Sequence, residues 1–391
     1  MISISARIAA ASVASLLFVS LADAQEIRLG YLQATAGPFA TLSKTNELAA
    51  QIAVDQINSG GGIDGRKIHI VGFDTAGKPD QAVIGIRKLA EDDKVLAVIG
   101  PFSSGECRVV FPTGERLGIV SMSMGSSAPK LAEPYTYAFR NTSDEGYLFS
   151  KLLKTMKAKN IEMKTASVAY ATDDVVSKTM GEVIIPNQLK GNGIEVTTAV
   201  TFQTQAFDLS PQVSQIMSKP TDLVGVGAGP ESAIRIAQEL RRQGYRGRLI
   251  GGSTISDPEL AKRMGSAGDG TMFPTAFYPG LNERTKAFND ELIRRAKDAG
   301  IDRTSASQFD AATYSIVMLY AEAMRKASVT GAIANLVAER TAIRDQLRAL
   351  KDFPALEGSI TFQKSGDALK SSYIIEITNS EFKLIETHQV D

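Results

Sequence analysis

Strand-like and helix-like segments alternate along most of this chain, and that alternation restricts the fold more than any other feature. The segment VLAVIG, residues 95–100, is a continuous apolar run typical of a strand buried on both faces. Residues 43–58 and 78–93, which precede it, carry apolar side chains at helical spacing. Strands that alternate with helices of this length predict parallel sheets made of right-handed βαβ units.

A second series of the same kind begins with a predicted helix at 145–157, and further helices follow at 178–190 and 230–243. The chain has 391 residues, which is more than one compact domain usually holds. We therefore predict an α/β fold with two doubly wound, Rossmann-like lobes. Residues 25–143 and 276–355 are assigned to the first lobe, and 144–275 and 356–391 to the second. The C-terminal part alternates with period two, which predicts antiparallel strands near the hinge.

The N-terminus resembles an export signal. Arg7 precedes a run of small and apolar residues from 8 to 21, and Ala22-Asp23-Ala24 forms an A-x-A cleavage box. The apolar run is short for a membrane anchor, which needs about 20 residues. We expect residues 1–24 to be a signal peptide that is removed, leaving an exported, soluble protein.

Composition excludes several classes of function. Lysine plus arginine and aspartate plus glutamate number 43 each, which provides no basic footprint for nucleic acid or for a membrane surface. The chain has two histidines and one cysteine, Cys107, which cannot form an intrachain disulfide. These numbers do not support a Ser-His-Asp triad or a zinc site, so we predict no catalytic residue, no metal and no cofactor.

Two serine pairs follow two of the predicted strands. Ser103-Ser104 comes directly after VLAVIG, and Ser126-Ser127 follows LGIVSM. Ligands of open α/β sheets bind beyond the carboxyl ends of the strands, where helix N-termini offer free N–H groups. The two pairs could form an uncharged cradle for a carboxylate. They could equally be helix caps, since Ser103 and Glu106 fit the S-x-x-E capping box.

Four motifs in this order resemble a known family: IRLGYLQATAGPFA, AAQIAVDQINSGGGIDGRKI, VIGPFSSGECRVVFPTGERLGIVSMSMGSSAPKL and GSITFQKSGD. From Glu26 to about Glu386 the chain resembles the periplasmic solute-binding proteins of the leucine/isoleucine/valine type, which serve ABC importers. The resemblance implies a type I periplasmic-binding-protein fold, with two lobes joined by three crossing segments. It also implies a periplasmic, monomeric, non-enzymatic protein that closes around a small molecule and delivers it to a permease in the inner membrane.

Carried over by this resemblance, the family's carboxylate-binding serine falls on Ser104, and the groups that complete its cradle fall on Ser126 and Ser127. The acidic residue that holds an amino acid's ammonium group falls on Ser253, and a tyrosine of the second lobe falls on Val175. A buried ammonium without an anion is costly. We therefore favour a carboxylate without an amino group, such as an aromatic or short branched acid.

Other assignments stay open. Asp173, Asp174 or Asp257 could replace the missing negative charge, which would restore a branched-chain or other amino acid as the ligand. Large apolar side chains are expected on the cleft walls, although ordinary core packing explains each equally well; they are Tyr31, Phe39, Leu42, Phe102 and Tyr278. A periplasmic sensor that signals to a membrane receptor would have the same sequence features, and an enzyme on the same fold is a third possibility.

Overall fold

Five parallel strands form the sheet of the first lobe in the computed structural model, which describes residues 26–390. The strand order is β2, β1, β3, β4, β5, with these bounds: β1 (Ile27–Gln33), β2 (Ile68–Asp74), β3 (Ala97–Ile99), β4 (Val120–Ser123) and β5 (Ala138–Arg140). All four pairings are parallel, as the sequence predicts. The predicted signal peptide lies outside the described residues.

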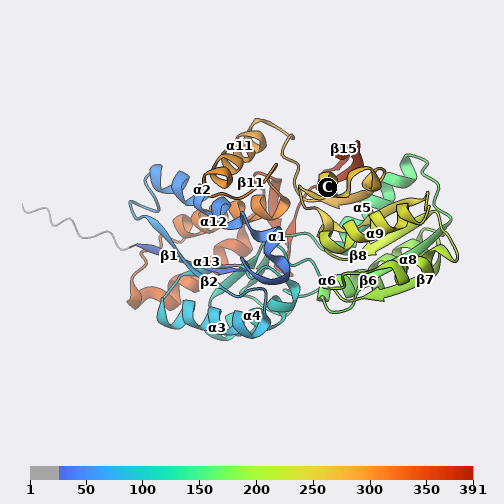
Figure 1. The fold of residues 1–391 in the computed structure, drawn as a ribbon. Coiled ribbons are helices and arrows are strands. Elements are labelled where there is room, and N and C mark those ends of the chain that lie inside the picture. Colours follow the sequence, from blue (N-terminus) through green and yellow to red (C-terminus); the bar gives the residue numbers. More distant parts are fainter. Residues whose placement is uncertain (1–25, 391) are drawn as a thin grey trace, which may run out of the picture.

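Helices cover both faces of this sheet (Figure 1). One face packs against α2 (Asn46–Ser59) and α12 (Gln308–Lys326), and the other against α3 (Pro79–Arg87) and α4 (Ser104–Leu117). Helices α11 (Glu283–Asp298) and α13 (Leu336–Ala349) complete the lobe. Much of the region after residue 276 thus returns to the first lobe. Shorter turns of helix lie between these elements: η1 (Gly37–Phe39), α1 (Ala40–Ser43), η2 (Lys88–Asp92) and η6 (Ile333–Asn335).

The second lobe has a seven-stranded sheet in the order β15, β14, β10, β9, β8, β6, β7. Its strands are β6 (Thr165–Ala171), β7 (Glu195–Phe202), β8 (Leu223–Gly227), β9 (Arg248–Gly251), β10 (Met272–Thr275), β14 (Ser372–Thr378) and β15 (Glu381–His388). The central strands are parallel, and β14 and β15 add an antiparallel edge. The two-lobed α/β fold predicted from the alternation is therefore confirmed.

Helices also cover both faces of the second sheet. One side holds α8 (Ser210–Met217), α9 (Pro230–Arg242) and α10 (Leu260–Met264), and the other holds α5 (Glu145–Ala158) and α7 (Ile185–Gly191). The helix predicted at 178–190 begins earlier, with α6 (Val175–Thr179), because Asp174 caps its N-terminus by accepting from Ser177 N at 2.9 Å. It continues through η3 (Met180–Ile184) into α7; η4 (Ser253–Ile255) and η5 (Gly265–Gly268) are shorter turns.

Within residues 26–390 the chain crosses between the lobes three times, and we call these stretches the crossing segments. The first, 141–144, joins β5 to α5; the second follows β10 at residue 276; and the third, 370–371, leads into β14. A small sheet of β11 (Phe353–Ala355), β12 (Gly358–Phe362) and β13 (Ala368–Leu369) precedes the third crossing. Its apolar side chains pack in the core of the first lobe, so only β14 and β15 of the range 356–391 join the second sheet.

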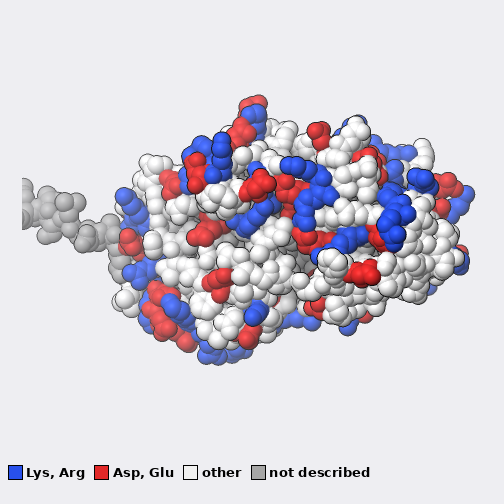
Figure 2. Space-filling model, viewed as in Figure 1, with Lys and Arg blue, Asp and Glu red and all other residues white. Residues whose placement is uncertain are grey.

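The surface carries both signs of charge on the face shown in Figure 2, where lysine and arginine are interspersed with aspartate and glutamate over both lobes. This pattern agrees with the equal numbers of acidic and basic residues in the sequence. Among the described residues, no helix is long and apolar enough to cross a membrane.

Candidate functional site

A cavity of about 320 Å³ lies between the lobes, within the range of about 300–1,000 Å³ that is common for small-molecule sites. The first lobe lines it with residues around 38–42 and 102–105, together with Gly125 and Phe309. The second lobe contributes 173–177 and residues of the start of α9. We call it the interlobe cavity. Helices α4 and α6 approach each other across it (Figure 1).

The N-terminus of α4 lies at this cavity, and its two serines make different contacts. Ser103 is the cap, because its hydroxyl accepts from Glu106 N at 3.2 Å while Glu106 accepts from Ser103 N at 2.9 Å. Ser104 is the first helical residue and lines the cavity. Its Oγ lies 3.2 Å from Ser126 Oγ and accepts from Ala128 N at 3.3 Å. The first N–H groups of the helix and the Ser104 hydroxyl can together bind an anion.

The structure thus brings the two serine pairs together, as expected for neighbouring parallel strands, but Ser126 and Ser127 stand behind the cavity wall. Both are buried, and neither lines the interlobe cavity. Ser126 contacts Ser104, while the Ser127 hydroxyl donates to Glu145 Oε1 at 3.1 Å. Of the three serines predicted to form the cradle, Ser104 therefore lines the interlobe cavity, and Ser126 and Ser127 do not.

Glu145 is a buried carboxylate that the sequence reasoning missed. It lies at the start of α5, and it accepts from Ser253 N at 3.0 Å and from Ser253 Oγ at 2.5 Å, in addition to Ser127. Burial raises the pKa of Glu145, and the hydrogen bonds from Ser253 offset part of that rise. A buried carboxyl group thus lies directly behind Ser253, the position where the resemblance places an acidic residue. In the sequence, Glu145 is indistinguishable from an ordinary acidic residue in the first turn of a helix.

Three phenylalanine rings form the apolar wall of the interlobe cavity. Phe102 lies between the other two, with its ring centroid 5.5 Å from that of Phe39 and 5.1 Å from that of Phe309. Leu42 and Val175 line the same cavity, from the first and the second lobe respectively. Phe309 was not anticipated, because it lies more than 200 residues from the other two rings in the sequence.

The two tyrosines expected on the cleft walls lie elsewhere. Tyr31 is buried in the core of the first lobe, and this burial raises the pKa of its hydroxyl. Tyr278 lines a separate cavity of about 530 Å³, between the second lobe and residues 304–308. Neither residue lines the interlobe cavity.

Charged side chains on the second-lobe wall have partners of their own. Asp173 accepts from Thr204 N and Thr204 Oγ1, both at 2.9 Å, and Asp174 caps α6. Arg235 is the one basic residue lining the interlobe cavity in the described part of the chain, and its Nη1 donates to Ala206 O at 2.6 Å. This wall therefore presents both signs of charge to a ligand.

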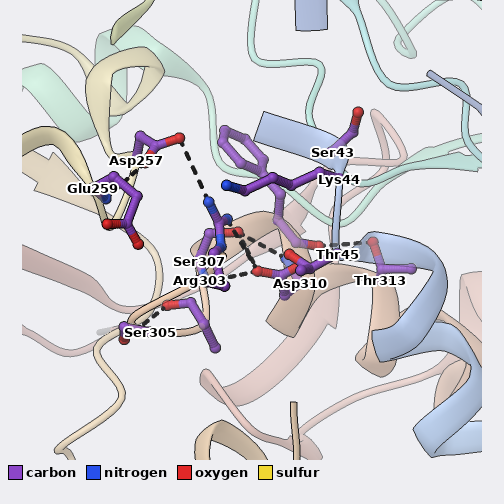
Figure 3. A network of polar contacts seen from close by, with 12 residues as sticks. Ser43, Lys44, Thr45, Asp257, Glu259, Arg303, Ser305, Ser307, Asp310 and Thr313 are labelled. Carbon is purple, nitrogen blue, oxygen red and sulfur yellow. Dashed lines mark hydrogen bonds and ion pairs between the residues drawn. The ribbon is translucent and has the colours of Figure 1, made fainter. Parts of the chain in front are cut away.

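Asp257, the third acidic candidate, belongs to a contact network between the lobes (Figure 3). Its carboxylate lies 3.6 Å from Arg303 Nη1, and Arg303 Nη2 lies 3.4 Å from Asp310 of α12. Beside it, Glu259 of the second lobe accepts from Thr304 N at 2.8 Å. Asp257 and Glu259 thus hold the second lobe against the loop before α12, outside the interlobe cavity.

Neither thiol nor metal chemistry is evident in this region. Cys107 is fully buried in α4, and burial raises the pKa of its thiol to about 12. Within residues 26–390, no group of three or more histidine, cysteine, aspartate or glutamate side chains is placed to hold a metal ion.

Comparison with known proteins agrees with this architecture. The sequence profile of a family described as periplasmic binding protein matches residues 26–381. The Leu/Ile/Val-binding protein BraC3 of Rhizobium johnstonii is 28% identical over 371 residues, which cover 92% of this chain and 94% of that protein.

Solved structures agree at the level of the fold. LivJ of Streptococcus pneumoniae, a branched-chain amino acid substrate-binding protein in complex with isoleucine, superposes with a TM-score of 0.80 at 22% identity and covers 94% of this chain and 99% of its own. A solute-binding protein of an ABC transporter from R. palustris, in complex with benzoate, superposes with a TM-score of 0.80 at 17% identity, covering 93% and 97%. This chain therefore belongs to the type I periplasmic binding proteins of the branched-chain amino acid family, which are solute-binding proteins and not enzymes.

Proposed function

We propose that this protein is the periplasmic solute-binding component of an ABC importer, and that it captures a small carboxylate with an aromatic or short branched body. The acid group binds to the Ser104 hydroxyl and the first N–H groups of α4. The body of the ligand packs against Phe39, Phe102 and Phe309. The protein acts as a monomer, and a permease in the inner membrane recognises the closed lobes.

The observation that carries this proposal is the position of Ser104 at an anion-attracting helix N-terminus, in the same cavity as the three phenylalanine rings. An uncharged donor set binds a carboxylate without a lysine or arginine. The buried carboxylate of Glu145 is satisfied by the two serines and does not line the cavity. The R. palustris solute-binding protein of the same fold is in complex with benzoate, which supports an aromatic acid as a candidate ligand.

The test compares two serines in the first turns of two helices on opposite walls of the cavity, Ser104 of α4 and Ser232 of α9. A hydrogen bond to a charged group contributes about 1.5–3 kcal/mol, so Ser104→Ala should weaken acid binding roughly 10- to 100-fold. Ser232→Ala and Arg235→Met should change the affinity little, measured by isothermal titration calorimetry. The reverse result would place the acid group on the second lobe.

An amino acid is the second candidate ligand, and Glu145 behind Ser253 is the observation that favours it. Matched ligand pairs separate the two candidates, because they share one body and differ in the ammonium group. We expect 3-phenylpropanoate to bind more tightly than phenylalanine, and 4-methylpentanoate more tightly than leucine. Tighter binding of both amino acids would overturn the preference for an acid without an amino group.

A further inference from the structure

A small space, which we call the hinge chamber, lies where the three crossing segments meet. Asn141, Thr142 and Ser143 of the first crossing line it, with Ala276 of the second and Lys370 of the third. Its volume is about 10 Å³, and it shares Gly125 and Phe309 with the lining of the interlobe cavity.

Two residues of this lining carry a side-chain polar atom that has no hydrogen-bond partner among residues 26–390. The atoms are Asn141 Oδ1 and Ser143 Oγ, on residues that are 0% and 4% exposed. The amide of Asn141 is oriented by its Nδ2, which donates to Ala312 O at 3.0 Å, so that Oδ1 is the free atom. A buried polar atom left unpaired destabilises the folded protein, which is a strong reason for these two atoms to have a partner.

Lys370 supplies a third polar group to the chamber. Its Nζ donates to Glu357 Oε1 at 2.8 Å and to Asn141 O at 3.0 Å. An ammonium group has three N–H donors, so one remains after these two bonds. The chamber therefore combines an acceptor, a hydroxyl and a donor, contributed by the first and third crossing segments.

We propose that the hinge chamber binds one ordered water molecule, which links the first and third crossing segments. A water needs a space of about 10–15 Å³ and two to four polar partners, and both conditions are met. The ammonium of Lys370 disfavours a cation at this position. The carboxylate of Glu357, bonded to that ammonium, and the small volume disfavour an anion.

This water stabilises the closed arrangement of the lobes. Since the chamber borders the interlobe cavity at Gly125 and Phe309, opening of the cleft connects its polar groups to bulk solvent. Loss of the bound water leaves the groups unpaired only in the closed form. Removal of this water should therefore shift the protein toward the open form and weaken ligand binding. The effect on binding rests on the proposed ligand capture, but the water site itself does not.

The experiment compares Ser143→Ala with Ser372→Ala. Ser372 is also buried, and its hydroxyl has no partner among the described residues, but it does not line the chamber, which makes it a matched control. Crystal structures at about 1.5 Å should show a water peak bonded to Asn141 Oδ1, Ser143 Oγ and Lys370 Nζ in the wild type and in Ser372→Ala. An empty chamber in the wild-type closed form would overturn the proposal.

Small-angle scattering and calorimetry then test the effect on the hinge. Ser143→Ala should increase the radius of gyration of the ligand-free protein and weaken the binding of benzoate, used as the probe, roughly 3- to 10-fold relative to Ser372→Ala. An ordered water with neither effect would overturn the hinge role. A failure of benzoate to bind the wild type would contradict only the proposed ligand class, because the water peak and the scattering do not depend on it.

Discussion

Arg303 is the buried cation that joins the two lobes, and its removal is the most informative stability test. Its side chain is 0% exposed and lies 3.6 Å from Asp257 of the second lobe and 3.4 Å from Asp310 of the first (Figure 3). With an effective dielectric constant of about 20, each ion pair contributes an attraction of about 5 kcal/mol. Desolvation of each ion costs several kcal/mol in return.

Arg303→Met should therefore leave two buried carboxylates without a cation, which typically costs about 3–5 kcal/mol. The unfolding entropy is about 0.8 kcal/mol/K for a chain of this length, so the melting temperature should fall by roughly 4–6 °C. Differential scanning calorimetry measures this shift. Arg294→Met is the control, because Arg294 lies on the surface of α11, where its side chain is 58% exposed. The control should stay within about 1 °C of the wild type.

Asp257→Asn, unlike Arg303→Met, is expected not to lower the stability of the protein. Burial raises the pKa of Asp257, and Arg303 offsets that rise only in part, so its charged form is disfavoured in the folded protein. A carboxyl group with a raised pKa contributes stability when it is protonated, and this contribution is lost as the pH rises through its folded pKa. Asp257→Asn should thus be at least as stable as the wild type at pH 7, since Arg303 keeps Asp310 as its partner.

Two results would refute this reasoning. One is an Arg303→Met variant that melts within about 1 °C of the control, which would mean that the buried carboxylates do not need the cation. The other is an Asp257→Asn variant that loses as much stability as Arg303→Met at neutral pH, which would mean that the interlobe pair itself holds the fold.

Three further predictions concern the site and its surroundings. Glu145→Gln should have a higher melting temperature than the wild type at pH 7, measured by circular dichroism. The difference should shrink as the pH falls toward 4.5, because burial raises the pKa of Glu145 and protonation removes its buried charge. An equal difference at both pH values would contradict this. Native Cys107, whose pKa is about 12, should not react with a thiol reagent at pH 8 and should react once the protein is unfolded. Gly125→Ala should weaken ligand binding, because the added Cβ would lie 2.8 Å from the carbonyl oxygen of Phe102 and displace Phe102 in the cavity wall. Unchanged affinity in a titration would contradict this.

The architecture could be predicted from the sequence because it depends on periodicity. Continuous apolar runs identified buried parallel strands, and helical spacing between them identified the covering helices. The same reasoning placed Ser104 and Ser126 on one rim, and their hydroxyl oxygens lie 3.2 Å apart. It also allowed for Ser103 as a helix cap, and the structure shows the complete capping box with Glu106.

The remaining features depend on contacts between distant segments, which local patterns do not encode. Glu145 is the clearest case, because only the approach of the two lobes brings Ser127 and Ser253 to its carboxylate. Phe309 lines the interlobe cavity because α12 packs on the first lobe. Tyr31 does not line it, because helices cover that face of β1 and bury the side chain in the core. The partner of Asp257 could not be inferred, since Arg303 lies in a loop without periodicity.

Within residues 26–390 the chain crosses between the lobes three times, so this part of the chain begins in one lobe and ends in the other: β1 lies in the first sheet, and β15 forms an edge of the second (Figure 1). Fluorescent donor and acceptor groups attached near β1 and β15 would therefore lie on different lobes. Energy transfer between them would report each opening and closing event in real time, with no label placed near the bound solute.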